Sequence, residues 1–263
     1  MCAASREIPE LLQKMLWDRE EEISAILTSG TLKAGADFLR TRQVTGWVSK
    51  GRGTGICGRV PDFPMRKQLS VYTCQRRWSI AGEESREEAV MIANHIHSLI
   101  CSTYGHTLVL FTSYTLMGSV YQILRDSLPF PMVEVWRHSQ EEILRFKTME
   151  NGVLFAAGSC WEGVDFPGDM VSSLIIVKLP FSVPDPIHEA QREQYRSLES
   201  YIQNVVVPDM QKKLRQGFGR AIRTEQDTCV VSILDHRAAK KGKYQGDVLD
   251  ALPKCQMAEK SMK

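Results

Sequence analysis

The sequence predicts an α/β domain built on a mostly parallel sheet with helices on both faces. From about residue 68 onward, short apolar runs alternate with longer helical patterns. Two of these runs, Thr107–Phe111 (TLVLF) and Ser173–Val177 (SLIIV), are apolar after their first residue, which is typical of strands buried on both faces. Because strands that alternate with helices form βαβ units, the strands are expected to lie parallel.

The N-terminal part of the chain is less regular. Residues 7–17 carry apolar side chains at helical spacing, residues 23–28 form a short strand-like run, and residues 34–43 predict a second helical piece. The stretch 46–66 holds five glycines and two prolines, which favour an irregular connection. We therefore expect a domain boundary there, with residues 46–67 as a linker.

The regular part begins at residue 68 and ends near 252. Its apolar runs predict strands at 69–73, 107–111, 132–135, 153–157, 173–177 and 229–234. Its helical patterns predict helices at 83–101, 114–126 and 139–150, across about 186–223, and at 244–251. The helix at 83–101 opens with acidic residues, which suit the positive end of its dipole. Residues 253–263 are expected to form a frayed tail.

Composition excludes several classes of protein. The 263 residues are 43% hydrophobic and 24% charged, as in a packed soluble protein, and no run approaches the roughly 18 apolar residues that a membrane span needs. The N-terminus lacks the pattern of a signal peptide, so we expect a cytoplasmic protein with no membrane partner. The seven cysteines are scattered without C-x-x-C spacing, so reduced thiols and neither a metal site nor an iron–sulfur cluster are expected.

Positive charge is concentrated between Lys33 and Arg77, with ten Lys and Arg residues against two acids. Such a stretch either contacts phosphates or forms a solvated basic surface.

A glycine-rich stretch, Gly53–Gly58 (GTGICG), matches the spacing G-x-G-x-x-G. A dinucleotide fingerprint needs a buried strand before it and a helix after it, and here two prolines follow. A Walker A loop needs Lys and then Ser or Thr after the last glycine, whereas Arg59 and Val60 stand there. We interpret the stretch as a flexible loop, so this chain lacks its own Walker A loop.

Arginines near the end of the predicted 186–223 helical region indicate binding of a polyanion. On one continuous helix, Gln216, Gly219, Arg220 and Arg223 would share a face, while the apolar residues between them face a core. Two guanidinium groups on such a face can hold phosphate oxygens in a fixed geometry. The alternative is an ordinary solvated basic face.

A second polar segment, Gly158–Gly168 (GSCWEGVDFPG), directly follows the strand predicted at 153–157. Ligands of parallel α/β sheets bind beyond the carboxyl ends of strands, so this turn is a candidate site. Glu162 and Asp165 either accept hydrogen bonds from ribose hydroxyls or from the arginines, or they only cap the turn.

These segments together resemble a known family. Gly158–Gly168 resembles motif V, and Gln216–Arg223 (QGFGRAIR) resembles motif VI, of superfamily-two helicases in the branch that contains DinG and XPD. Residues 25–32 (AILTSGTL) resemble motif III of that branch, and residues 107–117 (TLVLFTSYTLM) resemble its motif IV region. The four motifs occur in the family's order, and the similarity runs from about residue 20 to 252.

The resemblance implies a motor of two RecA-like domains with ATP and Mg²⁺ bound in the cleft between them. In that motor, an arginine of motif VI stabilises the charge of the transferring phosphate, and Arg223 is the expected arginine finger. By the same resemblance, the catalytic group is Arg223, Arg220 and Gln216; the nucleotide contacts are Glu162, Gly163, Asp165 and Gly219; the DNA-backbone contacts are Thr112, Ser113, Tyr114 and Ser159; and Ser29, Gly30 and Thr31 couple nucleotide to DNA.

The resemblance also assigns the domains. Residues 1–45 correspond to a remnant of the first helicase domain including motif III, and residues 68–252 to the C-terminal RecA-like domain with motifs IV, V and VI. The implied function is the C-terminal half of an ATP-dependent 5′→3′ DNA helicase that acts in DNA repair or replication on single-stranded or forked DNA. Its Walker A and B residues would come from a first domain in cis or in trans, so the chain alone is expected to be inactive. The alternative is a non-catalytic nucleic-acid-binding or regulatory module.

Overall fold

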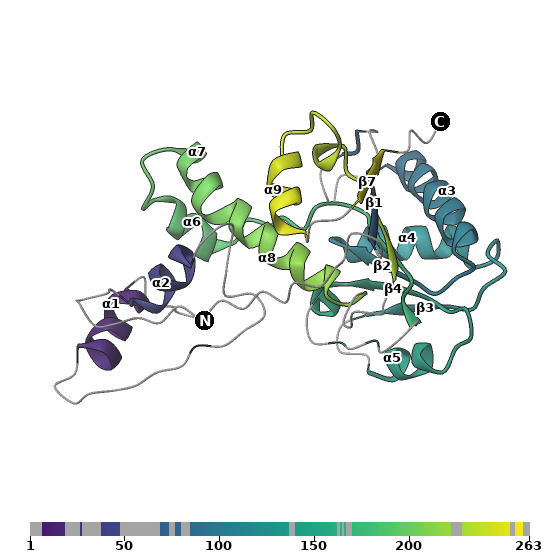
Figure 1. The fold of residues 1–263 in the computed structure, drawn as a ribbon, viewed down its shortest axis with the longest axis horizontal. Coiled ribbons are helices and arrows are strands. Elements are labelled where there is room, and N and C mark those ends of the chain that lie inside the picture. Colours follow the sequence, from purple (N-terminus) through teal and green to yellow (C-terminus); the bar gives the residue numbers. More distant parts are fainter. Residues whose placement is uncertain are drawn as a thin grey trace. The chain divides into compact units, whose positions relative to one another are not determined.

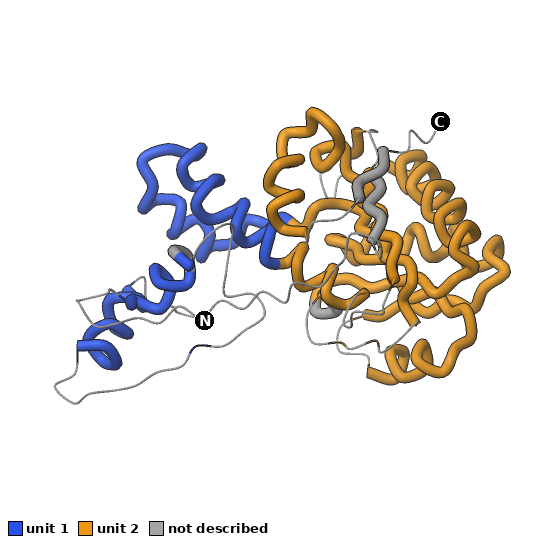
Figure 2. The backbone as a smooth tube through the Cα atoms, viewed as in Figure 1, with its two compact units in different colours: residues 1–62, 181–212 blue, residues 63–180, 213–263 orange. Residues whose placement is uncertain are grey.

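The computed structural model describes residues 7–18, 27, 38–47, 69–73, 77–79, 85–136, 140–161, 164, 166, 170–221, 228–252 and 256–259. The chain divides into two compact units (Figure 2). Unit 1 comprises Met1–Asp62 and Phe181–Lys212, and unit 2 comprises Phe63–Pro180 and Lys213–Lys263. None of the helices in these described ranges is long and apolar enough to cross a bilayer.

Unit 1 is helical in its described residues. It contains α1 (Ile8–Leu12), a π-helical turn (Gln13–Trp17), α2 (Leu39–Thr45), α6 (Pro186–Arg192), α7 (Leu198–Tyr201), a second π-helical turn (Ile202–Val206) and the first half of α8 (Val207–Phe218). The Trp17 indole donates a 2.8 Å hydrogen bond to the Thr45 carbonyl, which ties the first helical segment to α2. The helix predicted at 7–17 is confirmed, while the strand-like run 23–28 lies outside the described residues except for residue 27.

Within its described residues, unit 2 contains one sheet of seven strands in the order β3-β4-β2-β5-β6-β1-β7. Every pairing in it is parallel, as the sequence predicts. The strands are β1 (Leu69–Thr73), β2 (Thr107–Phe111), β3 (Met132–Val135), β4 (Val153–Ala157), β5 (Ser173–Ile176), β6 (Cys229–Ile233) and β7 (Gln256–Glu259). All residues of β2, β4 and β5 are buried, because helices cover both faces of the sheet.

The two faces carry alternate side chains of each strand. Val109 and Phe111 belong to the core cluster that packs under α3 (Arg86–Ser102) and α4 (Tyr114–Leu124). Leu110 points to the opposite face, where Gly217 of α8 lies against it. The helices α5 (Gln140–Lys147) and α9 (Gln245–Ala251) also belong to the described part of this unit (Figure 1).

The C-terminal residues correct one prediction. Gln256–Glu259, expected in a frayed tail, form β7, which pairs in parallel with β1 over Ser70–Thr73. The expectation is wrong at these four residues because β1 leaves an unpaired edge, and backbone groups of a short polar segment can pair with it whatever their side chains.

The cysteines that the structure describes with their side chains are both free thiols. Cys101 is half-buried and Cys229 is buried. Burial raises the pKa of Cys229 to about 12, so its thiol stays protonated and unreactive near neutral pH.

Candidate functional site

Three neighbouring strands end together at the carboxyl edge of the sheet. In the strand register, Phe111 at the end of β2 lies beside Ala157 at the end of β4, and Val135 at the end of β3 lies beside Ala156. The residues that follow, Thr112, Trp136 and Gly158, therefore lie along one edge. Ligands of parallel sheets bind at such an edge.

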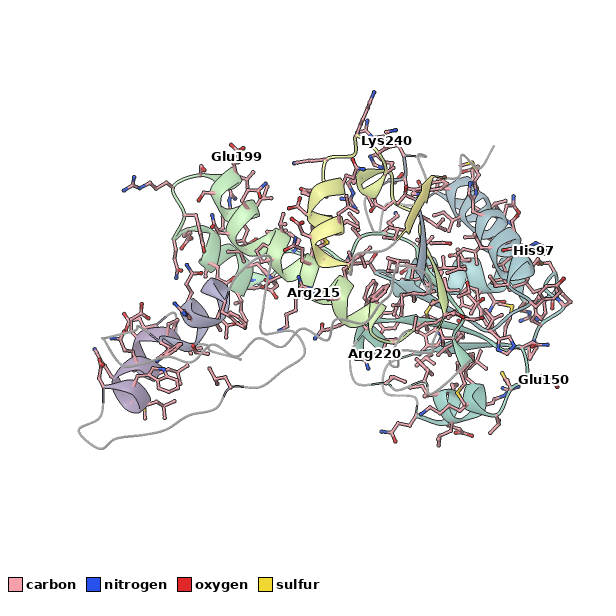
Figure 3. The ribbon with its side chains drawn as sticks, viewed as in Figure 1. His97, Glu150, Glu199, Arg215, Arg220 and Lys240 are labelled. Atoms are coloured by element: carbon pink, nitrogen blue, oxygen red, sulfur yellow. The ribbon has the colours of Figure 1, made fainter. Side chains whose placement is uncertain are left out.

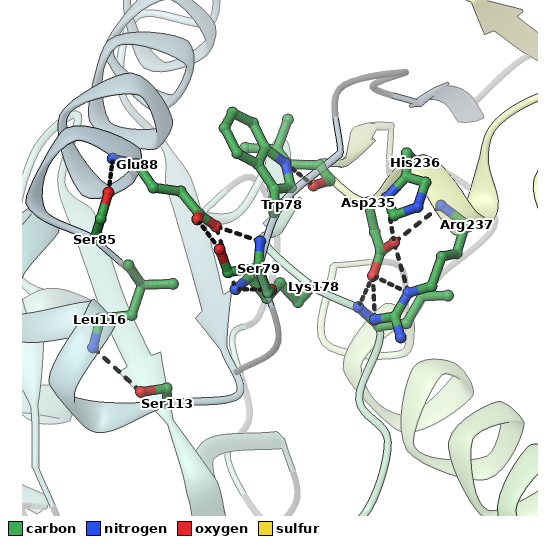
Figure 4. A network of polar contacts seen from close by, with 12 residues as sticks. Trp78, Ser79, Ser85, Glu88, Ser113, Leu116, Lys178, Asp235, His236 and Arg237 are labelled. Carbon is green, nitrogen blue, oxygen red and sulfur yellow. Dashed lines mark hydrogen bonds and ion pairs between the residues drawn. The ribbon is translucent and has the colours of Figure 1, made fainter. Parts of the chain in front are cut away.

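The N-terminus of α4 forms the first part of the site. Ser113 is the N-cap, and its hydroxyl oxygen accepts a 3.2 Å hydrogen bond from the Leu116 amide (Figure 4). A serine hydroxyl keeps its own proton for a further acceptor while it caps the helix. The partial positive charge of the helix N-terminus lies at the same place, so this corner suits an anion.

Tyr114 connects this corner to the turn after β4. Its hydroxyl donates to the Ala157 carbonyl at 3.4 Å. The next residue, Gly158, has a left-handed φ of 60°, and a Cβ there would overlap the Tyr114 hydroxyl oxygen. Glycine is required at this turn both for its backbone conformation and for the close approach of the tyrosine.

Trp161 also holds the turn after β4 in place. It ends the 3₁₀ turn Gly158–Trp161, is 5% exposed, and donates its indole N–H to the Phe111 carbonyl at 2.9 Å. Gly217 of α8 lies against its ring, because a Cβ at that glycine would stand 2.8 Å from ring carbon Cε3. One buried indole therefore joins the end of β2, the turn after β4 and α8.

The α8 helix ends earlier than the sequence predicts. It stops at Phe218, and after Gly219 the amides bond three residues back, with Arg220 N–H to the Gly217 carbonyl at 3.1 Å and Ala221 N–H to the Phe218 carbonyl at 3.0 Å. The prediction that one continuous helix extends beyond Phe218 is therefore wrong, since Gly217 and Gly219 weaken the helix at its end. The apolar side of the segment is confirmed as core, because Leu214, Phe218 and Ala221 are buried.

Arg220 joins the end of α8 to the polar turn. Its Nη1 donates a hydrogen bond to the carbonyl of Val164, and the side chain is half-buried. Figure 3 labels Arg220 at this end of the helix. One turn earlier, Gln216 is half-buried, and its Oε1 is buried without a hydrogen-bond partner among the described residues. A buried amide oxygen of this kind calls for a donor from a ligand, a partner or another segment.

Arg215 on the same helix has a structural role. Its Nε donates to the Ala251 carbonyl at 3.2 Å and its Nη2 to the Asp250 carbonyl at 3.5 Å. These are the last carbonyls of α9, where a cation also complements the helix dipole. Of the arginines near the end of α8, this one anchors a helix and Arg220 reaches the polar turn.

Gly217→Ala is expected to destabilise the protein by about 1–2 kcal/mol. The new methyl group would lie under 3 Å from the buried Trp161 ring and 3.1 Å from Leu110 Cδ1, and overpacking outweighs the gain in helix propensity. Gly219→Ala is the matched control. A Cβ there meets only the Arg215 and Gln216 carbonyls at 3.4 and 3.6 Å, so its effect should stay within about 0.5 kcal/mol in urea unfolding. An equal cost for both variants would contradict the role of Trp161.

Beyond β5, a buried ion pair occupies the other half of the same edge. Lys178 Nζ lies 3.6 Å from Glu88 Oε1, and the two side chains are 4% and 9% exposed. Both groups also bind Ser79, whose amide and hydroxyl donate to Glu88 at 2.8 and 2.5 Å and whose carbonyl accepts from Lys178 at 2.7 Å (Figure 4). The neighbouring Trp78 is buried and donates its indole N–H to the Leu234 carbonyl at 2.6 Å.

Asp235 completes this polar half of the edge. Its carboxylate accepts from the Leu179 amide at 2.9 Å, from the Arg237 amide at 3.0 Å and from Arg237 Nη2 at 2.7 Å (Figure 4). Burial alone would raise the pKa of Asp235, but the hydrogen bonds and positive charge of Arg237 outweigh burial and hold that pKa below its ordinary value. The segments after β5 and β6 are therefore joined through one carboxylate.

Asp235→Asn is expected to cost about 2 kcal/mol of stability at neutral pH, because a charged acceptor of several hydrogen bonds is lost. Since the folded pKa lies below the unfolded one, the contribution of Asp235 is fully present above the unfolded pKa of about 4. It is lost as the pH falls through the folded pKa. Urea unfolding of both proteins from pH 7 to pH 2 should thus show a difference that is constant above about pH 4 and shrinks below it. A difference that grows in acid would contradict this linkage.

Comparison with known proteins identifies the family. Residues 96–255 match the family model of the helicase C-terminal domain, which is more than half of the chain. The chain belongs to the helicase C-terminal domain family. The polar turn after β4 and the end of α8, which resemble motifs V and VI of the DinG and XPD branch, both lie within the matched residues.

Sequence similarity to individual relatives of this helicase C-terminal domain agrees with the family match. The chain is 36% identical over 259 residues to the 3′-5′ exonuclease DinG of Bacillus subtilis, which covers 95% of this chain and 27% of the relative. It is 37% identical over 258 residues to the ATP-dependent DNA helicase DinG of Photobacterium profundum, which covers 94% of this chain and 36% of the relative. The chain therefore spans about a quarter to a third of these proteins. A solved XPD helicase shares the fold, with a TM-score of 0.59 and 20% identity over 73% of this chain and 35% of that chain.

The structure describes part of the site expected for a helicase C-terminal domain. Thr112, Ser113 and Tyr114 lie together at the carboxyl edge of the sheet, and the backbone of Ser159 belongs to the adjoining turn. Gln216, Gly219 and Arg220 lie at the end of α8. The remaining expected residues, Glu162, Gly163, Asp165, Arg223, Ser29, Gly30 and Thr31, lie outside the described residues.

Two groups of residues in this helicase C-terminal domain are not predicted by its motifs. Trp161 and Gly217 lie within the motif segments, but the motifs do not indicate that the two residues touch. The signal for this contact is a large aromatic ring in one segment and a glycine in the other. Glu88, Lys178 and Asp235 come from three distant segments, and no local pattern connects them. Lys178 alone gives a signal, as a charge inside the apolar run SLIIVKLPF.

Proposed function

We propose that this chain is the second motor domain of an ATP-dependent 5′→3′ DNA helicase. The observation that carries the proposal is the hydrogen bond from Arg220 to the Val164 carbonyl, which joins one arginine of the motif VI segment to the motif V segment. The arginine side of an ATP site needs such a link, because its guanidinium groups must be held in place before the nucleotide arrives. Relatives named ATP-dependent DNA helicases in Photobacterium profundum and Haemophilus influenzae support the same proposal.

The nucleotide role belongs to the end of α8 and the motif V turn. Arg223 acts as the arginine finger and Arg220 as its neighbour, while Gln216 supplies the buried amide oxygen that still needs a donor. Glu162, Gly163, Asp165 and Gly219 contact the nucleotide. ATP with Mg²⁺ is bound jointly by this chain and a first RecA-like domain that carries the Walker A and B residues. That first domain acts in cis or in trans, and ATP supplies the phosphoryl group for hydrolysis.

The DNA role belongs to the start of α4. Ser113 keeps a hydroxyl proton while it caps the helix, and the helix N-terminus adds partial positive charge, so a phosphate of single-stranded or forked DNA is a suitable ligand. Thr112, Tyr114 and Ser159 complete this contact. Ser29, Gly30 and Thr31 couple it to the nucleotide, in a segment of the first domain over residues 1–45 that precedes the linker 46–67 and the motor domain 68–252. The cellular role we propose is DNA repair or replication in the cytoplasm.

Strand displacement tests this function. The full chain is mixed with a separately produced first RecA-like domain, and unwinding is followed on duplexes with a 5′ tail, a 3′ tail or no tail. The proposal expects ATP-dependent unwinding of the 5′-tailed duplex and little of the other two. Salt-dependent DNA binding without unwinding or ATP hydrolysis would instead favour a non-catalytic nucleic-acid-binding or regulatory module.

A further inference from the structure

Trp136 differs from the other two tryptophans described in unit 2. Trp78 and Trp161 are 9% and 5% exposed, and both donate their indole N–H to backbone carbonyls. Trp136 is 47% exposed and makes no hydrogen bond within the described ranges. Single exposed apolar residues are common, so exposure alone assigns no role to this ring.

The position of the Trp136 ring and the contacts that hold it distinguish it from other exposed apolar side chains. Trp136 directly follows β3 at the carboxyl edge, and its ring stacks on Tyr114 with centroids 5.6 Å apart and an angle of 17°. Tyr114 is itself fixed by its hydrogen bond to the Ala157 carbonyl and by its contact with Gly158. Gly118 of α4 leaves room for the indole, since a Cβ there would lie 3.3 Å from Trp136 Cζ2. The indole is therefore held in place although nearly half of its surface is exposed.

This geometry suits a nucleotide base. Tyr114 covers part of the indole and is next to Ser113, the proposed phosphate contact at the start of α4. The ends of β3 and β2 are two strand spacings apart, about 10 Å, so an apolar ring and an anion corner are neighbours on one edge. Proteins that bind single strands without sequence preference combine these two features, a backbone contact and an aromatic stacking surface.

We propose that Trp136 is a base-stacking platform for single-stranded DNA, with Tyr114 as the ring that positions it. The inference rests on the proposed DNA contact at the start of α4 and adds a base contact beside it. The stacking is independent of base identity, because every base offers an aromatic face. The indole and the base stack by contact alone, so no bond is made or broken.

Binding of two oligomers to the full chain tests the platform. One is an oligodeoxythymidylate, and the other is an abasic oligomer with the same number of phosphates. Trp136→Ala is expected to weaken binding of the oligodeoxythymidylate about 5- to 100-fold and to leave binding of the abasic oligomer unchanged. Trp136→Phe should keep most of the affinity. Tyr104→Ala is the matched control, because Tyr104 is 75% exposed at the amino edge of the sheet, just before β2.

The outcomes separate this inference from the proposed function. Equal weakening of both oligomers by Trp136→Ala would mean that the ring only supports its surroundings, and the platform would be wrong. Unchanged binding of both would also reject it, while leaving the phosphate contact intact. If the wild-type chain binds neither oligomer, the DNA contact of the proposed function fails together with the platform.

Discussion

Arg223→Ala is expected to lower the turnover number of DNA-stimulated ATP hydrolysis about 10³-fold or more, once the chain is combined with a first RecA-like domain. The transferring phosphate carries spread negative charge, and a guanidinium group placed at the right moment stabilises that charge more in the transition state than in the ground state. The loss should therefore appear in kcat, with a smaller change in KM for ATP. Steady-state phosphate release at saturating DNA measures both.

Two matched variants give this prediction its controls. Arg223→Lys keeps the charge but loses the planar fork, so it should recover only part of the rate. Arg196→Ala removes an exposed arginine of unit 1 and should leave the rate close to that of the wild type. Normal turnover by Arg223→Ala would reject its assignment as the arginine finger and would move that role to Arg220.

Glu88→Ala is expected to destabilise the protein by about 3–5 kcal/mol. The change leaves the Lys178 ammonium group, only 4% exposed, without its carboxylate, and it removes both acceptors from Ser79. Removing the counter-charge of a buried charge is among the costliest changes in a folded protein. Urea unfolding followed by circular dichroism measures the loss.

The double variant Glu88→Leu with Lys178→Met should recover the part of that stability that Glu88→Ala loses at the Lys178 charge, because replacing a buried ion pair by apolar groups of similar volume is often close to neutral. The part lost at Ser79 remains, since neither new side chain can accept its hydrogen bonds. Asp126→Ala is the surface control. Its pair with Arg125 has side chains 53% and 83% exposed, so the cost should be about 0–1 kcal/mol. If Glu88→Ala costs no more than Asp126→Ala, the buried pair does not stabilise the edge of the sheet.

The strands of unit 2 could be predicted closely from the sequence. The runs TLVLF and VLFAA are apolar apart from Thr107, and β2 and β4 begin and end where those runs do. Continuous apolar runs of this length are possible only where both faces of a strand are covered, so pattern and structure agree. The resemblance to helicase motifs then located the polar turn after β4 and the end of α8.

The rest depends on contacts between distant segments. The spacing from Gln216 onward predicted one long helix, yet α8 ends at Phe218, because helical spacing ignores the cost of Gly217 and Gly219. β7 forms because the edge of β1 accepts it, and its own residues gave no apolar signal. Trp136 is exposed and stacked only because α4 brings Tyr114 and Gly118 beside it.

The most direct measurement of the central claim is ATP hydrolysis by the chain alone, by a first RecA-like domain alone, and by the two together, each with and without single-stranded DNA. A second motor domain without a Walker A loop should show negligible hydrolysis by itself and should produce DNA-stimulated hydrolysis when the first domain is added. Hydrolysis by the chain alone at the rate of the pair would contradict the account. So would a mixture no faster than the first domain by itself.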